Sequence, residues 1–405
     1  MRGEIEEEMR KRQIQAILII GETTLADPNL TYAVGGDLTR GGVYFKRVGH
    51  EPLLVTSNLD AQTARKLGRV KRIESFSQWS LEELVAKYGR GEAYPRLLAG
   101  IAQKNGVQER IALYGRNDLA VGTYLVDRLR KLGVKVSSDE SPTLLETVRE
   151  TKDAEEIRQL RDVGRKTGRV VDTITHVLGS LKRKRGHLTL KGRRATVGLI
   201  KARIGLEIAS EGLRTPEGTI FAIGASSADP HNPGLSSNEI KEGKLIVFDI
   251  FPQGESGYWH DLTRTFIIGR AGSRDRQQFD AVSEAQTACL DLMKPGVIAE
   301  EVMSRACDII ERRGYRTIRE VFQGKVKNVS SGFNHSLGHG VGLTIGERPY
   351  LSLLNKEPLR YRQVVTVEPG VYLPGHGGVR IEDTVLITER RAETLSNVDK
   401  QFEIT

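Results

Sequence analysis

Hydrophobic and polar residues follow two different patterns along this chain, and the change between them divides it into two parts. In the first 140 residues, short apolar runs at 16–20, 42–45, 52–56 and 110–113 alternate with helix-like stretches at 1–14, 60–67, 81–88 and 119–132. Gly133 is expected to end the last of these helices. Strands that alternate with helices predict an α/β domain with a partly parallel sheet.

The second part opens with a long amphipathic pattern. We place the boundary within 139–152 and expect an N-terminal domain at 1–150 and a C-terminal domain at 151–405. Asp153 followed by Glu156 predicts a capping box at the start of a helix with apolar residues at helical spacing. Further helices are predicted at 191–209, 274–293 and 299–313, and a strand at 219–223. Helices interleaved with antiparallel hairpins predict an α+β domain.

Residues 245–266 predict a β-hairpin that carries two acids. Two β-rich runs flank a Pro-Gln-Gly-Glu-Ser turn, and Asp249 and Asp261 are equidistant from Glu255 at its centre. Simple pairing sets the two aspartates opposite each other, with Cβ atoms roughly 4.5–5.5 Å apart. Such carboxylates repel unless a proton or a cation lies between them. The alternative is a pair of solvated surface acids near a turn.

Residues 364–388 repeat this arrangement. Glu368 and Glu382 lie symmetrically about Gly375 in a Pro-Gly-His-Gly-Gly turn, so a second pair of carboxylates is expected to face each other. A glycine-rich run between the hairpins carries His335 and His339. Four acids and an imidazole suit divalent Mn, Co, Fe or Zn. Two such ions roughly 3.5–4 Å apart need bridging carboxylates, which facing pairs supply.

The order of these motifs carries a family resemblance. An aspartate followed by DLTRTF, then GHG, VEPG and RIED, resembles the pita-bread metallopeptidases. That family includes methionine aminopeptidases, Xaa-Pro aminopeptidases, prolidases and the metal-free creatinases. The resemblance implies a pseudo-duplicated pita-bread domain of antiparallel hairpins covered by helices. It also implies that two divalent metal ions are held by five ligands: Asp249, Asp261, His339, Glu368 and Glu382.

The same resemblance suggests roles in catalysis and substrate binding. Glu368 would act as the general base or proton shuttle, and His231 would contact substrate and assist proton movement. His335 would line the substrate pocket, although a solvent-facing histidine is the alternative. Arg380 shares a strand face with Glu382 and could orient a carboxylate or a substrate carbonyl. Its alternative role is simply to neutralise the neighbouring acids.

One position departs from the family pattern. Relatives commonly have a second histidine seven residues after the metal-binding one, where it stabilises the tetrahedral intermediate, and Gly346 occupies that position here. A slow peptidase is therefore expected, unless His335 or Arg348 fills the space. The competing hypothesis is a catalytically weak or non-peptidase creatinase-like relative, either a binding protein or another C–N hydrolase. The five intact ligands argue against a metal-free version.

The N-terminal part narrows the expected substrate. Asn29, Tyr32 and Gly35 resemble the start of creatinase and prolidase N-terminal domains. The resemblance implies a homodimer and a domain that walls the active site, so that only short peptides react. It favours an Xaa-Pro aminopeptidase or a prolidase, which splits Xaa-Pro dipeptides, over a methionine aminopeptidase.

Composition adds limits on location and partners. Cys289 and Cys307 lie in helix-like stretches, which fits a reducing cytosol. The apolar run at 16–20 is too short for a secretory or membrane segment, so a cytoplasmic protein without a membrane partner is expected. The net charge is +9, and residues 181–203 hold nine basic residues and no acid. Because this run contains no aromatic residue for base stacking, we interpret it as a solvated helix and loop face and do not expect nucleic-acid binding.

Overall fold

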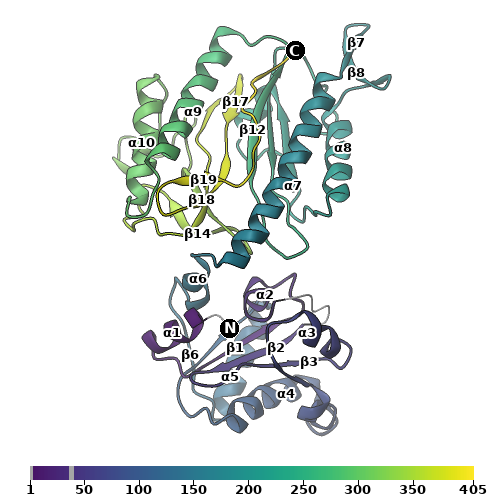
Figure 1. Cartoon of the computed structure of the whole chain (residues 1–405), viewed down its shortest axis with the longest axis vertical. Helices are drawn as coiled ribbons and strands as arrows, with labels where there is room; N and C mark the ends of the chain where they lie inside the picture. Colours follow the sequence, from purple (N-terminus) through teal and green to yellow (C-terminus); the bar gives the residue numbers. More distant parts are fainter. Residues whose placement is uncertain (1–2, 36–40) are drawn as a thin grey trace. The chain divides into compact units, whose positions relative to one another are not determined.

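A mixed sheet forms the centre of the first part of the chain. The computed structural model describes residues 3–35 and 41–405, which form two units that divide between Arg149 and Glu150 (Figure 1). The sheet of the first unit has the order β4(Arg72–Ser75), β3(Leu53–Thr56), β2(Gly42–Arg47), β1(Ala16–Gly21), β5(Ile111–Tyr114) and β6(Val136–Ser137). β2 is antiparallel to β1 and β3, whereas the pairs β1–β5, β5–β6 and β3–β4 are parallel. The prediction of a partly parallel sheet is confirmed.

Six α-helices and a short 3₁₀ turn accompany this sheet in the described residues. They are α1(Gly3–Lys11), α2(Pro28–Val34), α3(Ala61–Leu67), η1(Ser77–Trp79), α4(Leu81–Lys104), α5(Leu119–Lys131) and α6(Leu144–Arg149). Leucines of α4 and α5, among them Leu98 and Leu129, pack with Leu18 and Phe45 of the sheet in one buried core. α4 is longer than predicted because the chain resumes a helix after a kink at Gly89, where φ is +76°.

The second unit contains two halves, each with its own hydrophobic core. In the first half, β10(Thr219–Ile223), β11(Leu245–Ile250), β12(Leu262–Ile268) and β20(Glu403–Ile404) form a sheet against α7(Ala154–Gly179) and α8(Val197–Ser210). η2(Gly224–Ala228) follows β10. The predicted capping box is confirmed, because Asp153 and Glu156 exchange backbone and side-chain hydrogen bonds at the start of α7.

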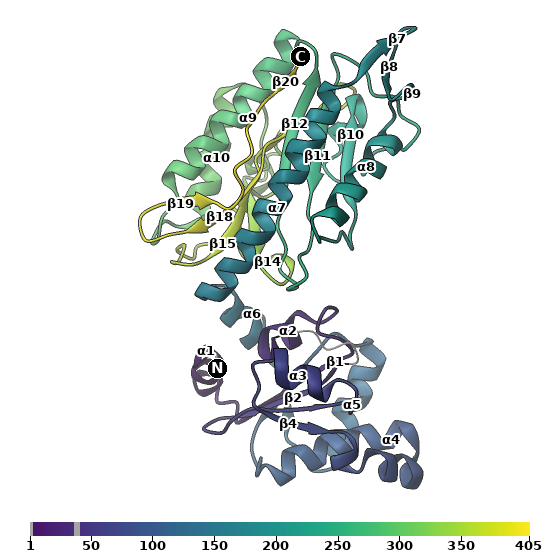
Figure 2. The ribbon, with the colours of Figure 1, turned by 45° about the vertical axis from the view of Figure 1, so that its right-hand side comes forward.

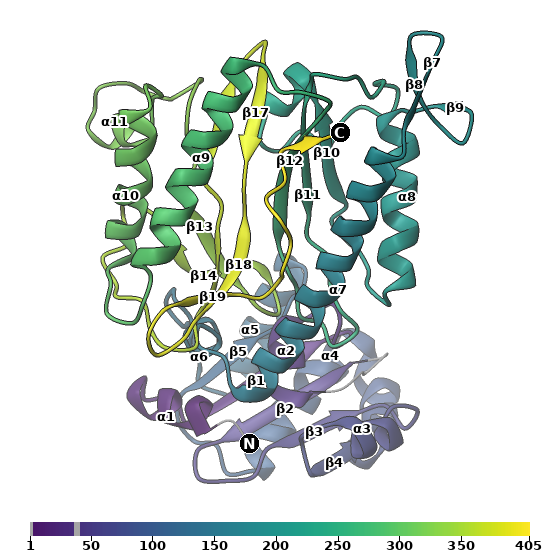
Figure 3. The same ribbon diagram turned by 45° about the horizontal axis from the view of Figure 1, so that its top comes forward.

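The second half repeats this design with a different pair of helices. Its larger sheet has the order β14(Ile345–Leu351), β13(Gly338–Val341), β15(Val364–Val367), β18(Asp383–Ile387) and β19(Ala392–Thr394), and β16(Gly370–Leu373) pairs with β17(Gly377–Arg380). The helices are α9(Ser273–Leu292), α10(Ala299–Arg312) and the short α11(Arg319–Phe322). Figure 3 shows the strands of the unit between α9 and α10 on one side and α7 and α8 on the other.

The basic run differs from its predicted structure. Residues 182–194 form a three-stranded meander, β7(Lys182–Lys184), β8(His187–Leu190) and β9(Arg193–Arg194), which extends from the end of α7 (Figure 2). Each of its turns has a basic residue followed by glycine, both at positive φ, as in the two-residue turns that suit β-hairpins. The helix predicted at 191–209 therefore begins only at Val197, where the Thr196 side chain accepts a hydrogen bond from the Leu199 amide.

No helix in residues 3–35 and 41–405 combines the length and the apolar character needed to cross a membrane.

Candidate metal centre

The first predicted hairpin exists, but its register differs from the prediction. Asp249 lies opposite Thr263, and Asp261 lies beyond the first paired residues of β12. The turn is centred one residue later than Glu255, because the Asp249–Thr263 pair and the hydrogen bond from the Gly254 amide to the Tyr258 carbonyl are both symmetric about that position. The prediction that the two aspartates lie directly opposite each other is therefore wrong. They occupy diagonal positions on the same face, because the pairing has slipped by an even number of residues.

The second hairpin has the predicted register. Val367 pairs with Asp383, and Gly370 pairs with Arg380. Continuing this register across the unpaired residues sets Glu368 opposite Glu382, as expected. Their backbone amides bond to other strands: Glu368 donates to the Leu337 carbonyl and Glu382 to the Thr263 carbonyl. Glu382 therefore joins the second hairpin to β12, and Glu368 joins it to the segment before β13.

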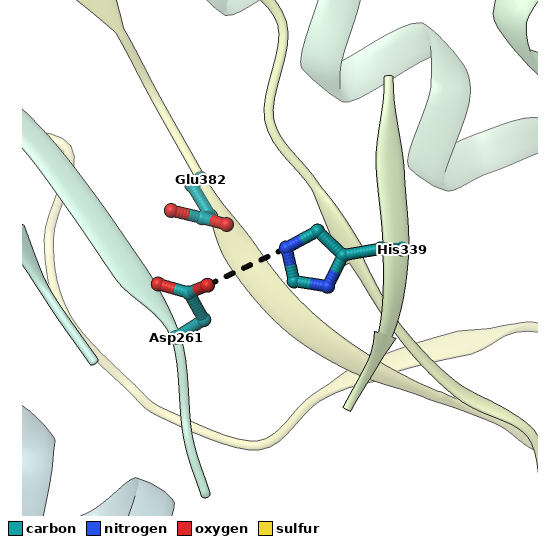
Figure 4. A group of neighbouring side chains, drawn as sticks. All are labelled: Asp261, His339 and Glu382. Atoms are coloured by element: carbon teal, nitrogen blue, oxygen red, sulfur yellow. Dashed lines mark ion pairs between the residues drawn. The ribbon is translucent and has the colours of Figure 1, made fainter. Parts of the chain in front are cut away.

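Asp261, His339 and Glu382 converge on one point (Figure 4). One potential ligand atom from each of these side chains lies within 4.8 Å of the others. Nε2 of His339 is 3.6 Å from Oδ2 of Asp261 and 3.5 Å from Oε1 of Glu368. Nδ1 of His339 lies 3.1 Å from the Gly340 carbonyl and accepts from the Gly346 amide at 3.2 Å, while Nε2 faces the acids.

Asp249 is held beside this cluster by a buried arginine. Its Oδ2 forms an ion pair with the Arg380 guanidinium, which also donates to Thr263 Oγ1 at 3.1 Å and to the Tyr372 hydroxyl at 3.0 Å. Thr263 in turn donates to Oε2 of Glu382 at 2.7 Å. Arg380 thus forms an ion pair with an acid of the site, which matches the neutralising role given as its alternative, and its contact with substrate stays a prediction.

The electrostatics of the cluster favour a bound cation. Burial, followed by the charge of Glu382, raises the pKa of Asp261 well above its ordinary value. Burial and then the charge of Glu368 do the same to the pKa of Glu382. Burial also raises the pKa of Glu368 to about 7, in spite of the nearby Arg380. Carboxyl groups crowded in this way become fully ionised at neutral pH only when positive charge is supplied to them.

Two carboxylate oxygens directly support the presence of a cation-binding site. Oδ1 of Asp249 and Oε1 of Glu382 are buried and have no hydrogen-bond partner among the described residues. A buried carboxylate oxygen without a partner is costly, and a metal ion would satisfy it. Oxygen ligands with one imidazole are the donor set that Mn, Co, Fe and Zn accept. The residues present therefore fit divalent metal ions.

These side chains line a pocket of about 530 Å³ together with two further histidines. His231 is exposed on a loop at the pocket wall, and His335 lies on the segment before β13. Nδ1 of His335 faces the Ser336 carbonyl at 2.7 Å, so it carries the proton and Nε2 accepts from the Tyr372 hydroxyl at 3.0 Å. Burial lowers the pKa of His335 to about 3, which keeps the ring neutral.

Gly346 lies at the pocket and leaves the expected histidine position open. Its φ is +76°, and a Cβ built there would meet no atom within 4 Å. Arg348 does not fill the space, because its guanidinium donates to Glu150 at 2.7 Å and Glu357 at 2.9 Å. The suggestion that Arg348 replaces the missing histidine is therefore wrong. His335 lines the pocket, but both of its ring nitrogens already have protein partners.

The sequence reasoning missed two polar residues that complete the site. Thr263 links Arg380 to Glu382, and Tyr372 links Arg380 to His335. Thr263 had a local signal, because it lies two residues after Asp261 and strand alternation places both on one face. Tyr372 had a weaker signal, because it lies diagonally across the second hairpin from Arg380, whereas its other partner, His335, lies outside that hairpin.

The arrangement of two helix pairs around curved strands, with acids and a histidine between the hairpins, defines the pita-bread class of metallopeptidase fold. A model of metallopeptidase family M24 matches residues 158–389, which is more than half of the chain. The chain belongs to metallopeptidase family M24.

Relatives and a solved structure agree with this assignment. The chain is similar to the Xaa-Pro dipeptidase of Pyrococcus furiosus, with 40% identity over 185 residues, which cover 45% of this chain and 48% of that one. It is 27% identical to the Xaa-Pro dipeptidase of Pyrococcus horikoshii over 97% of this chain and 96% of the relative. The crystal structure of the prolidase from Pyrococcus horikoshii OT3 superimposes with a TM-score of 0.75 at 25% identity, and the match covers 99% of both chains.

Proposed function

We propose that this protein is a metal-dependent exopeptidase that hydrolyses the bond before proline in short peptides. It would either split Xaa-Pro dipeptides or remove an N-terminal residue that precedes proline. The observation that carries the proposal is the buried group of acids around His339, with carboxylate oxygens left without partners at a pocket. The names of the two Pyrococcus relatives, both Xaa-Pro dipeptidases, support the substrate class.

Five residues would hold the two metal ions: Asp249, Asp261, His339, Glu368 and Glu382. Bound divalent ions lower the pKa of water and polarise a carbonyl group, which is the chemistry that peptide hydrolysis needs. Of the five side chains, Asp249 would have to share its carboxylate between a metal ion and Arg380, and its free Oδ1 makes this feasible.

The remaining pocket residues would handle substrate and protons. Glu368 would accept the proton of the attacking water and pass it to the leaving amine. His231, which also lines the pocket, would contact the substrate and assist this transfer. His335 would form part of the wall around the substrate, with its orientation set by Tyr372.

The test combines metal analysis with peptide hydrolysis. The full chain is stripped with a chelator, reloaded separately with Mn²⁺, Co²⁺ and Zn²⁺, and assayed on Ala-Pro, Ala-Pro-Ala and Ala-Ala. We expect two ions per chain and cleavage of one or both proline peptides, with Ala-Ala a poor substrate. A chain that binds none of these metals, or that cleaves Ala-Ala as well as the proline peptides, would contradict the proposal.

A further inference from the structure

A buried glutamine on α9 contacts the backbone on both sides of the paired glutamates. Gln286 is fully buried, and its Nε2 lies 3.1 Å from the Val367 carbonyl and 3.3 Å from the Ile381 carbonyl. These carbonyls belong to the residues that immediately precede Glu368 and Glu382. Nε2 is also 3.1 Å from Oδ2 of Asp383, the residue after Glu382. Three surrounding acceptors identify this terminal atom as the nitrogen.

The hairpin needs this contact because its own hydrogen bonding is interrupted there. β15 ends at Val367 and β16 begins at Gly370, while β17 ends at Arg380 and β18 begins at Asp383. Pro369 lies in the gap, and its carbonyl accepts from the Ile381 amide at 3.4 Å. Proline has no N–H to return to the Ile381 carbonyl. Gln286 supplies the missing donor.

The other side of Glu382 is held in the same way by Arg264. Its guanidinium donates to the Glu382 carbonyl at 2.6 Å and to Oδ1 of Asp383 at 2.7 Å. Asp383 therefore connects Arg264 with Gln286. The backbone that carries Glu382 is fixed from two directions, but only Gln286 also reaches the strand that carries Glu368.

We propose that Gln286 is a positioning residue that sets the spacing between Glu368 and Glu382, and with it the capacity of this pair to share metal ions. The inference rests on the metal-binding role proposed for the two glutamates. Oε1 of Gln286 is buried and has no hydrogen-bond partner within the described part of the chain. An apolar side chain would avoid that cost, so the N–H donors are what this position requires.

α9 also provides a matched control. Gln278 is equally buried, and its Nε2 donates to the carbonyls of Val371 at 2.7 Å and Gly377 at 3.2 Å. It lies eight residues before Gln286, roughly 12 Å along the helix, and it ties together the outer part of the same hairpin. Its Oε1 likewise has no partner in the described residues. The two glutamines differ in their distance from the glutamates and in the additional contact of Gln286 with Asp383.

The experiment compares Gln286→Met with Gln278→Met in the full chain. Methionine keeps the approximate size and removes the donors. Metal-free proteins are titrated with Mn²⁺ against a competing chelator, and their Tm values are measured in parallel. Both variants should lose thermal stability, and Gln286→Met should lose more because it also removes a donor to the buried Asp383 carboxylate. Gln286→Met should bind at least one Mn²⁺ about 10–100-fold more weakly than wild type, whereas Gln278→Met should stay within about threefold.

Each outcome of this experiment either supports or contradicts the positioning role of Gln286. If wild type binds two Mn²⁺ ions and the two variants bind them alike, the positioning role is wrong while the proposed function stands. If wild type binds no Mn²⁺ or other metal, both the positioning role and the proposed function are wrong. If Gln286→Met does not fold, Gln286→Asn and Gln278→Asn take its place, because asparagine keeps the amide but falls one methylene short of both carbonyls. Equal Mn²⁺ affinities for the two asparagine variants would overturn the inference.

Discussion

Glu368→Gln should stabilise the metal-free protein at alkaline pH, and the gain should shrink as the pH falls. Burial raises the pKa of Glu368 to about 7, so the folded chain holds this proton more tightly than the unfolded chain. A carboxyl group with a raised pKa leaves stability intact at low pH and reduces it as the pH rises through the folded-state value. Glutamine is neutral throughout and removes this penalty.

The size of the effect follows from the shift. Each pKa unit corresponds to about 1.4 kcal/mol. Raising the pKa from 4.5 to about 7 makes Glu368 cost the folded state about 3 kcal/mol at pH 8 and about 1 kcal/mol at pH 5. The difference in unfolding free energy between variant and wild type should therefore change by roughly 2–3 kcal/mol between these pH values. The charge of Glu368 also raises the pKa of Glu382. Removing that charge therefore lowers the cost of ionising Glu382, which stabilises the variant further at alkaline pH.

Urea unfolding in the presence of a chelator, at pH 5, 6.5 and 8, measures this difference. A Trp79→Phe background leaves Trp259 of the second unit as the only tryptophan, so that its fluorescence reports the unit that contains the site. Buried His260 and His335, whose pKa values burial lowers to about 3, affect variant and wild type alike and cancel. A difference that does not vary with pH, or a variant less stable than wild type at pH 8, would refute the reasoning.

Three further changes test other parts of the structure. Asp261→Ala should abolish peptide hydrolysis and lower the metal content while circular dichroism stays close to wild type; full activity would contradict the ligand set. Gly346→His should raise kcat on Ala-Pro by up to about 10² at unchanged metal content, since the space is open, but the positive φ should cost about 1 kcal/mol in unfolding free energy. Wild-type kcat equal to that of relatives with the histidine would show that it is dispensable. Glu6→Gln should destabilise the first unit by about 1 kcal/mol at pH 7, because the Lys46 ammonium holds the pKa of Glu6 down to about 2. This contribution to stability is present above pH 4.5 and disappears as the pH falls towards 2. Thermal unfolding should therefore show a larger effect of the substitution at pH 7 than at pH 2. An equal effect at both pH values would count against the ion pair.

Features that depend on residues close together in the chain were predicted from the sequence, whereas features that depend on how strands pair were not. The capping box at Asp153 and the facing of Glu368 and Glu382 were predictable because each depends on residues close in the chain: a helix start and a symmetric turn. The basic meander was missed because the Arg-Gly and Lys-Gly turns resemble ordinary loop sequence until the strands pair. The predicted register of the first hairpin was wrong by two residues, because several residues of the Pro-Gln-Gly-Glu-Ser-Gly segment could have formed the turn.

The sequence by itself determined which side chains could form a metal centre, because strand alternation places the acids of each hairpin on one face even where the register differs by two residues. Only the tertiary structure decided how they are held. Arg380 reaches Asp249 from another hairpin, Tyr372 fixes His335, and Gln286 bridges two strands from a helix far earlier in the chain. Contacts between segments so distant in sequence leave no periodic signal, because they depend on how the two cores bring helices and hairpins together.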